Sequence, residues 1–174
     1  KKYSNISDKI IELSKKFGSN DTEVFISNTI NNNVEARKGK VEYSEISDNT
    51  LITLRVINEK KSAIVSTSDL SDESLKEIVI KANEISKKSL ENPFNILARN
   101  NQLSKNLNCI NLEIFDKEIN NPDIVSFFEE MAITADEASQ KSSKILNTDG
   151  SNVGASINEF FLCTSNGFSN GFKR

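Results

Sequence analysis

Histidine is absent from all 174 residues of the sequence. Without it the chain cannot build a Ser-His-Asp or Cys-His catalytic set, nor the helix that binds zinc through two histidines. Cysteine is scarce as well: Cys109 and Cys163 stand far apart and lack the C-x-x-C spacing of many metal and redox sites. We expect both to be semi-buried thiols, because disulfides are rare in reducing compartments.

Long apolar runs and the common ligand-binding loops are also missing. No apolar stretch approaches the roughly 20 residues that cross a bilayer, so we expect no membrane contact and a cytoplasmic location. The P-loop, G-x-G-x-x-G and D-x-D-x-D-G patterns do not occur. A net charge of −3 argues against direct binding of nucleic acid. The sequence therefore predicts no catalytic, cofactor-binding or metal-binding residue.

The first third of the chain has the pattern of one helix followed by an antiparallel meander of four or five strands. Apolar residues from Ile6 to Phe17 recur at helical spacing, and Gly18 is the expected end of that helix. Strands are predicted over residues 22–30, 34–37, 41–47, 50–57 and 62–67. Turns are predicted at Asn31-Asn32-Asn33, Lys38-Gly39-Lys40, Asp48-Asn49 and residues 58–61. In the fourth strand, the alternating residues expected in the core are Ile52, Leu54 and Val56.

From Ala63 to Phe94 a strand is followed directly by a capped helix. Ser71 is the predicted N-cap, with acidic residues in the first turn, where they meet the positive end of the helix dipole. Leu70 and Leu75 stand at the positions of a hydrophobic staple. Asn92-Pro93 is expected to stop the helix. The predicted buried stripe consists of Leu75, Ile78, Val79, Ala82 and Ile85.

The second half alternates irregular and regular segments. Residues 98–120 are interpreted as a linker within the domain, and Asn121-Pro122 as the start of a third helix. The final strands are predicted over residues 144–148 and 153–164, joined by a turn at Asp149-Gly150-Ser151. The inner face expected for the third helix consists of Ile124, Phe128, Met131, Ala135 and Ala138. These elements predict an α+β fold, an antiparallel sheet packed with about three helices.

Some residue groups allow both a structural and a functional interpretation. Ser66-Thr67-Ser68-Asp69 contains hydroxyls but no adjacent base to activate them, so we interpret it as a strand end and helix cap. Cys163 has no cation near it in sequence, and we interpret it as packing. The Asn- and Gly-rich hairpins of the first third could guide an extended peptide by edge pairing. Either the core or an interface would suit the aromatic group Phe160, Phe161, Phe168 and Phe172.

Several short strings occur in an order that resembles one known family. Residues 63–71, Ala-Ile-Val-Ser-Thr-Ser-Asp-Leu-Ser, are similar to a small-residue strand followed by Thr-Asp-Leu-Ser and a helix. The other strings are Glu23-Val24, Gly39-Lys40-Val41-Glu42, Asn92-Pro93-Phe94, Asn147-Thr148-Asp149-Gly150-Ser151 and Thr164-Ser165-Asn166-Gly167-Phe168. Together they resemble the N-terminal domain of the TldD/PmbA, or modulator of DNA gyrase, family, and the PmbA (TldE) branch more closely.

The resemblance implies that the sequence is part of a longer protein that acts in a protein complex. Residues 1–174 would be a single N-terminal domain of a longer two-domain protein, and the abrupt end of the chain agrees with that expectation. Family members look like subunits of a cytoplasmic zinc metalloprotease that processes or degrades short or unfolded peptides. The zinc ligands belong to a His-Glu-x-x-x-His helix in the C-terminal part of the TldD branch, and the PmbA branch lacks that motif.

The function expected from this resemblance is that of a PmbA/TldE-like protease subunit. The present segment would form chamber and subunit interface, with no cofactor of its own and with zinc in a TldD-type partner. Its partners would be that subunit, in a heterodimer, or a second copy of itself, together with peptide substrates. The alternative is a regulatory module that binds a peptide or protein and has no proteolytic role.

Overall fold

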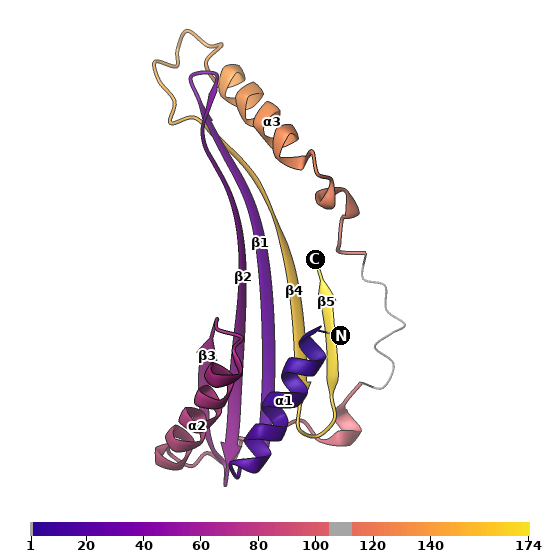
Figure 1. Cartoon of the computed structure of the whole chain (residues 1–174). Helices are drawn as coiled ribbons and strands as arrows, with labels where there is room; N and C mark the ends of the chain where they lie inside the picture. Colours follow the sequence, from indigo (N-terminus) through magenta and orange to yellow (C-terminus); the bar gives the residue numbers. More distant parts are fainter. Residues whose placement is uncertain (1, 105–112) are drawn as a thin grey trace. The chain divides into compact units, whose positions relative to one another are not determined.

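The computed structural model describes residues 2–104 and 113–174, in which helices pack on an antiparallel sheet (Figure 1). The expectation for Cys109 lies outside these residues. The described elements are, in chain order, α1 (Lys2–Lys16), β1 (Asp21–Arg37), β2 (Lys40–Asn58), β3 (Lys61–Thr67), α2 (Asp72–Lys88), the short 3-10 helices η1 (Asn100–Gln102) and η3 (Lys117–Asn120), α3 (Ile124–Ser139), β4 (Ser151–Thr164) and β5 (Ser169–Lys173).

Within the described residues the strands form one five-stranded sheet in the order β3-β2-β1-β4-β5. β2 and β3 pair antiparallel from Ile52 opposite Thr67 to Asn58 opposite Lys61. The predicted α+β fold is confirmed. No helix in the described ranges is long and apolar enough to cross a membrane.

The chain divides into two compact units, to which β1, β2 and β4 each contribute residues. Unit 1 comprises Lys1–Asn28, Thr50–Leu112 and Glu159–Phe172. Unit 2 comprises Thr29–Asn49, Glu113–Asn158 and Lys173–Arg174.

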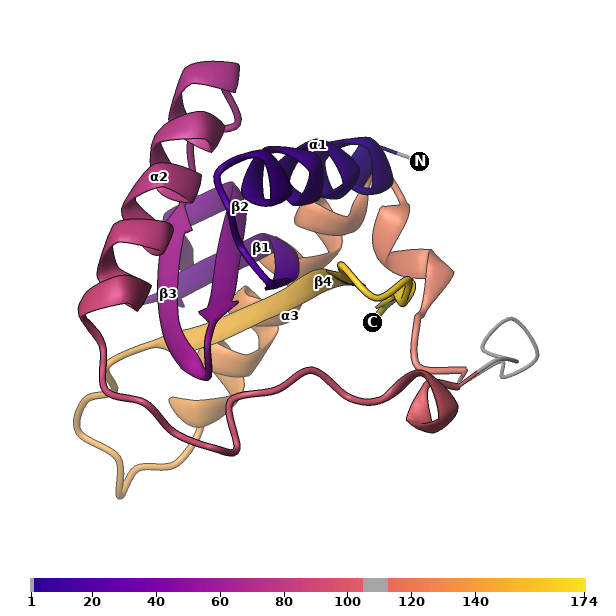
Figure 2. The ribbon, with the colours of Figure 1, turned by 90° about the horizontal axis from the view of Figure 1, so that it is seen from below.

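The core of unit 1 lies between the sheet and two helices. α1 and α2 contribute to the same apolar cluster as β1 and β2. Figure 2 shows the two helices beside these strands. The predicted alternation along β2 is confirmed, because Ile52, Leu54 and Val56 are fully buried. The buried members of this cluster are Ile10, Val24, Ile26, Ile52, Leu54, Val56, Leu75, Ile78, Val79 and Ala82.

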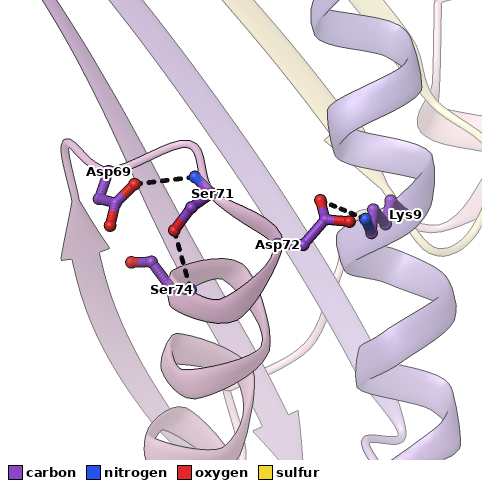
Figure 3. A network of polar contacts seen from close by, with 5 residues as sticks. All are labelled: Lys9, Asp69, Ser71, Asp72 and Ser74. Atoms are coloured by element: carbon purple, nitrogen blue, oxygen red, sulfur yellow. Dashed lines mark hydrogen bonds and ion pairs between the residues drawn. The ribbon is translucent and has the colours of Figure 1, made fainter.

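The predicted cap of α2 is confirmed and can be followed in Figure 3. The side chain of Ser71 accepts a hydrogen bond from the Ser74 N–H at 3.3 Å, and Ser71 N–H in turn donates to Asp69 at 2.8 Å. Asp72, in the first turn, forms an ion pair with Lys9 of α1. The cap therefore begins the helix and also links it to its neighbour.

The far end of α2 differs from the predicted stripe. Ile85 is 48% exposed, and its place toward the core is taken by the polar residues Asn83 and Ser86. Asn58 at the end of β2 donates to Asn83 Oδ1 at 2.9 Å and to Ser86 Oγ at 2.8 Å. These bonds satisfy the buried amide groups, so a polar cluster replaces apolar packing here.

Two buried serines of α1 lack such partners. Ser7 and Ser14 are fully buried, and their hydroxyls have no hydrogen-bond partner. We expect Ser14→Ala to leave stability unchanged or to raise the free energy of unfolding by about 0.5–2 kcal/mol, since it removes an unsatisfied group and favours the helix. In contrast, Ser86→Ala should lower it by about 1–3 kcal/mol, because it breaks a satisfied cluster. Urea unfolding of both variants checks this difference, and equal shifts would contradict it.

Unit 2 has a smaller core beneath α3. Its buried residues are Val34 and Ala36 of β1 with Phe128 and Ala132 of α3. The inner face predicted for α3 is wrong at Met131, Ala135 and Ala138, which are exposed. The helix instead buries Phe128, Ala132 and Asp136, at intervals of four residues. The sequence pattern does not predict this stripe, because its last residue, Asp136, is charged.

The strands are longer and differently placed than the sequence indicates. The turns predicted at Asn31-Asn32-Asn33 and Asp48-Asn49 are wrong, because β1 and β2 continue through them. Residues 144–148, predicted as a strand, form none. The hairpin tip at Lys38-Gly39 is confirmed, with positive φ angles of 53° and 70°.

Candidate functional site

A polar hollow lies on unit 2, where β1, β2 and β4 are neighbours in the sheet. Its volume is about 530 Å³, within the range of about 300–1,000 Å³ typical of ligand sites. Its lining residues are polar or small: Asn31, Asn32, Asn33, Glu45, Ser47, Asn152, Gly154, Ala155 and Ser156. Of these nine, Glu45 alone carries a formal charge. A ligand here would be bound by hydrogen bonds more than by apolar burial.

Side chains from three strands are joined across this hollow. Ser156 Oγ donates to Asn31 Oδ1 at 2.6 Å, and Asn31 Nδ2 makes a longer contact of 3.5 Å to Ser47 Oγ. Beside them, the Tyr43 hydroxyl donates to Glu45 Oε2 at 2.6 Å, and this bond raises the pKa of Tyr43. Amides and hydroxyls both donate and accept, so the hollow matches a ligand with both kinds of group, such as a peptide backbone.

Gly154 permits the close approach of β4 to β1 at this site. A Cβ at Gly154 would lie 2.7 Å from the Asn32 carbonyl oxygen and 2.9 Å from Asn33 Oδ1. Any side chain at this position would displace Asn33 from its place in the hollow. The sequence does not indicate the hollow, because consecutive asparagines are also typical of a turn.

Asp136 holds the tip of the β1–β2 hairpin against α3. Its side chain is fully buried, and Oδ2 accepts hydrogen bonds from Gly39 N–H at 2.8 Å and from Gln140 Nε2 at 2.9 Å. The hydroxyl of Thr148 donates to Oδ1 at 3.2 Å. The Gly39 bond is the largest cause that lowers the pKa of Asp136; Gln140 and Thr148 add to it, while burial opposes it.

The lowered pKa of Asp136 predicts a loss of stability in acid. Above the ordinary aspartate pKa of about 3.9 the contribution of the ionised carboxylate is complete. It declines as the pH falls toward the lower folded-state pKa, because the unfolded chain then binds more protons than the folded one. Asp136→Asn should therefore unfold at lower urea than the parent at pH 7, and the gap should narrow at pH 3. Glu130→Gln, at an exposed site on the same helix, is the control and should show no such gap.

The residues that the structure describes do not fit a zinc ion. Zinc is bound in proteins mainly by cysteine, histidine and carboxylate side chains, yet the chain has no histidine. Across residues 2–104 and 113–174, no group of three Cys, Asp or Glu side chains could hold a metal ion. Cys163 is buried, and that burial raises the pKa of its thiol, which disfavours the metal-binding thiolate.

The hydroxyl-bearing side chains within residues 66–69 form hydrogen bonds at the end of β3 and at the cap of α2. Thr67 Oγ1 lies 3.1 Å from Ser74 Oγ and accepts a hydrogen bond from Asp69 N–H. Ser66 Oγ lies 2.9 Å from Thr53 Oγ1 on the neighbouring strand. Each of these hydroxyls thus has a structural partner, in agreement with the interpretation from sequence.

The aromatic group near the C-terminus is divided between core and surface. Phe161 packs against the core cluster of unit 1. Phe160 stacks on Phe25 with ring centroids 5.9 Å apart and contacts Phe172 at 5.1 Å. Phe25 and Phe172 are 37% and 47% exposed, so these three rings form a partly open aromatic row across β1, β4 and β5.

Comparisons with known proteins give one consistent result. Residues 22–86 match the family model described as PmbA/TldA metallopeptidase domain 1. A search of curated proteins finds no match. A candidate modulator of DNA gyrase from Bacteroides thetaiotaomicron is similar with a TM-score of 0.81 and 18% identity, over 99% of this chain and 39% of that one. TldE from Thermococcus kodakarensis gives 0.71 and 14%, over 97% and 36%. A candidate modulator of a DNA gyrase from Thermotoga maritima gives 0.63 and 14%, over 98% and 37%.

At these identities the solved structures show a shared fold. The chain spans less than two fifths of the length of each of them. The chain has an α+β fold, and its residues 22–86 are similar to a domain of a metallopeptidase family. Residues 22–86 match the first domain of the PmbA/TldA family, and the resemblance predicted from the sequence is confirmed.

Proposed function

We propose that the chain is part of a PmbA/TldE-like subunit of a TldD/TldE-type metalloprotease that processes or degrades peptides. The observation that carries this proposal is the match of residues 22–86 to the first domain of a metallopeptidase family. The similarity to TldE over 97% of the chain supports the branch.

In this proposal the metal lies outside residues 1–174. Zinc is held by a TldD-type partner subunit, which agrees with the absence of histidine from this chain. The present segment is the N-terminal domain of a longer protein and contributes to the chamber and to the subunit interface. The complex acts in the cytoplasm on peptides, without direct contact with nucleic acid or membrane.

The test uses the full-length protein and a TldD-type partner from the same genome. Mixed at equal concentrations, they should elute from gel filtration as one complex. That complex should cleave an unstructured peptide, and a zinc chelator should abolish the cleavage. Separate elution of the two proteins would contradict the proposal.

A second candidate is a regulatory module that binds a peptide or protein and takes no part in proteolysis. The polar hollow of unit 2 favours it, because the hollow offers amide and hydroxyl groups, and no group of described residues could hold a metal ion. If the full-length protein binds unstructured peptides but forms no complex with a TldD-type partner, this candidate replaces the first.

A further inference from the structure

The outer edge of β2 in unit 2 has no strand beside it in the described part of the chain. β3 pairs with β2 only from Ile52 to Asn58, and β1 occupies the other edge. Residues 40–46 are all exposed, and Ser47 is half-buried. The described turns and loops make no backbone hydrogen bond to residues 40–47. Backbone N–H and C=O groups along this edge can therefore pair with another extended chain.

This edge lacks two common protections against pairing. Edge strands of natural proteins are commonly shielded by charged side chains, especially lysine, by proline or by a short length. Residues 41–47 contain neither lysine nor proline, although Lys40 precedes them. They include residues with high strand propensity, and Val41, Tyr43 and Ile46 are 37%, 47% and 65% exposed. An exposed edge of this kind is suited to pairing with a strand from another chain.

The charge of the edge indicates which chain would pair with it. The charged residues between 41 and 47 are Glu42 and Glu45, and Glu35 of β1 is also exposed. The hydroxyl of Tyr43 holds the Glu45 carboxylate by a 2.6 Å hydrogen bond. An incoming strand with lysine or arginine side chains would meet carboxylates here, while an acidic strand would be repelled.

The edge and the polar hollow share residues. Glu45 and Ser47 belong to β2 and also line the hollow. A side chain of an added strand that points to this face can therefore reach amide and hydroxyl groups as well as the Glu45 carboxylate. The edge would bind the backbone of the added strand, and the hollow would select among its side chains.

We propose that residues 41–47 of β2 bind an extended, basic peptide as an added strand, with a lysine or arginine side chain directed to Glu45. This rests on the proposed function, in which the protein takes peptides, and it deepens that function by assigning a binding edge and a charge preference. The peptide is bound here and is cut elsewhere.

The binding test uses the full-length protein and two labelled unstructured peptides that differ only in carrying lysine or glutamate at alternate positions. Fluorescence anisotropy should show the lysine peptide binding more tightly. The double variant Glu42→Lys/Glu45→Lys should weaken that binding about tenfold or more, because it replaces two attractive contacts by repulsive ones. Glu84→Lys, on an exposed position of α2, is the matched control for a charge reversal and should bind like the parent.

Hydrogen exchange locates the contact. With the lysine peptide bound, backbone amides within residues 41–47 should exchange more slowly, while those of β3 stay unchanged. Residues 41–47 that are already protected in the free full-length protein, and gain nothing from the peptide, would show that another segment or a second copy covers the edge. That result overturns the proposal, as does equal binding of the two peptides.

The two proposals can fail separately. Chelator-sensitive cleavage by the complex, together with equal binding of both peptides, would leave the protease assignment intact and remove the basic-peptide edge. Conversely, selective protection of residues 41–47 without any complex or cleavage would leave the edge intact and remove the protease assignment.

Discussion

Leu54→Ala is expected to lower the free energy of unfolding by about 2–5 kcal/mol. Leu54 is fully buried in the core cluster of unit 1, between the sheet and the two helices. Removing its side chain loses the transfer free energy of the buried methylene and methyl groups. It also leaves a cavity that neighbours such as Val79 can fill only partly. The measurement is urea unfolding, with the midpoint expected to fall at an unchanged slope.

Leu51→Ala is the matched control for this prediction. It makes the same chemical change three residues earlier on β2, but Leu51 is 44% exposed. Its expected effect is within about 0.5–1 kcal/mol. Comparable losses for the two variants would contradict the assignment of the core face of β2.

Local signals account for the parts of the fold that the sequence predicts. The alternation at Ile52, Leu54 and Val56 is visible within a few residues and places one face of β2 in the core. The N-cap at Ser71 is similarly local, since its partner Ser74 is three residues away. Such features depend on neighbours in sequence, and both are found in the structure.

Features that depend on distant partners are missed. Asn31 looks like a turn residue in sequence, yet its side chain bonds to Ser156, 125 positions away. The polar row across β1, β2 and β4 is therefore set by strand pairing and not by the turn preference of asparagine. Once three strands align, consecutive asparagines become the wall of a hollow.

Asp136 illustrates the same difficulty within a helix. The 3.6-residue period places it four residues beyond Ala132 on the buried stripe, but its charge argues for the solvent-exposed face. Its burial is explained by hydrogen bonds from Gly39, Gln140 and Thr148. Gly39 lies 97 positions away in the sequence. The sequence did contain one indication: a single acidic residue on the apolar stripe of a helix. Such a residue indicates a buried carboxylate with hydrogen-bond donors around it.

Gly150→Ala is the second variant with a large expected effect. Gly150 immediately precedes β4 and has a φ of +97°, a conformation that costs a residue with a side chain about 1–3 kcal/mol. A Cβ here would also overlap the carbonyl oxygen of Ala36 and lie 3.3 Å from Arg37 Cβ. Overpacking of this kind adds about 1–3 kcal/mol. The free energy of unfolding should therefore fall by about 2–6 kcal/mol, measured by urea unfolding.

Gly167→Ala separates the two causes of this loss. Gly167 has a nearly identical φ of +95°, but nothing lies within 4 Å of a Cβ built there. Its substitution should incur the backbone strain alone, about 1–3 kcal/mol. The difference between the two variants then measures the close approach of the start of β4 to the end of β1, the strand contact that brings Asn152 and Gly154 beside Asn33 in the polar hollow. An equal fall in the free energy of unfolding for the two variants would contradict the close contact between β4 and β1. The hollow would then be wider than described.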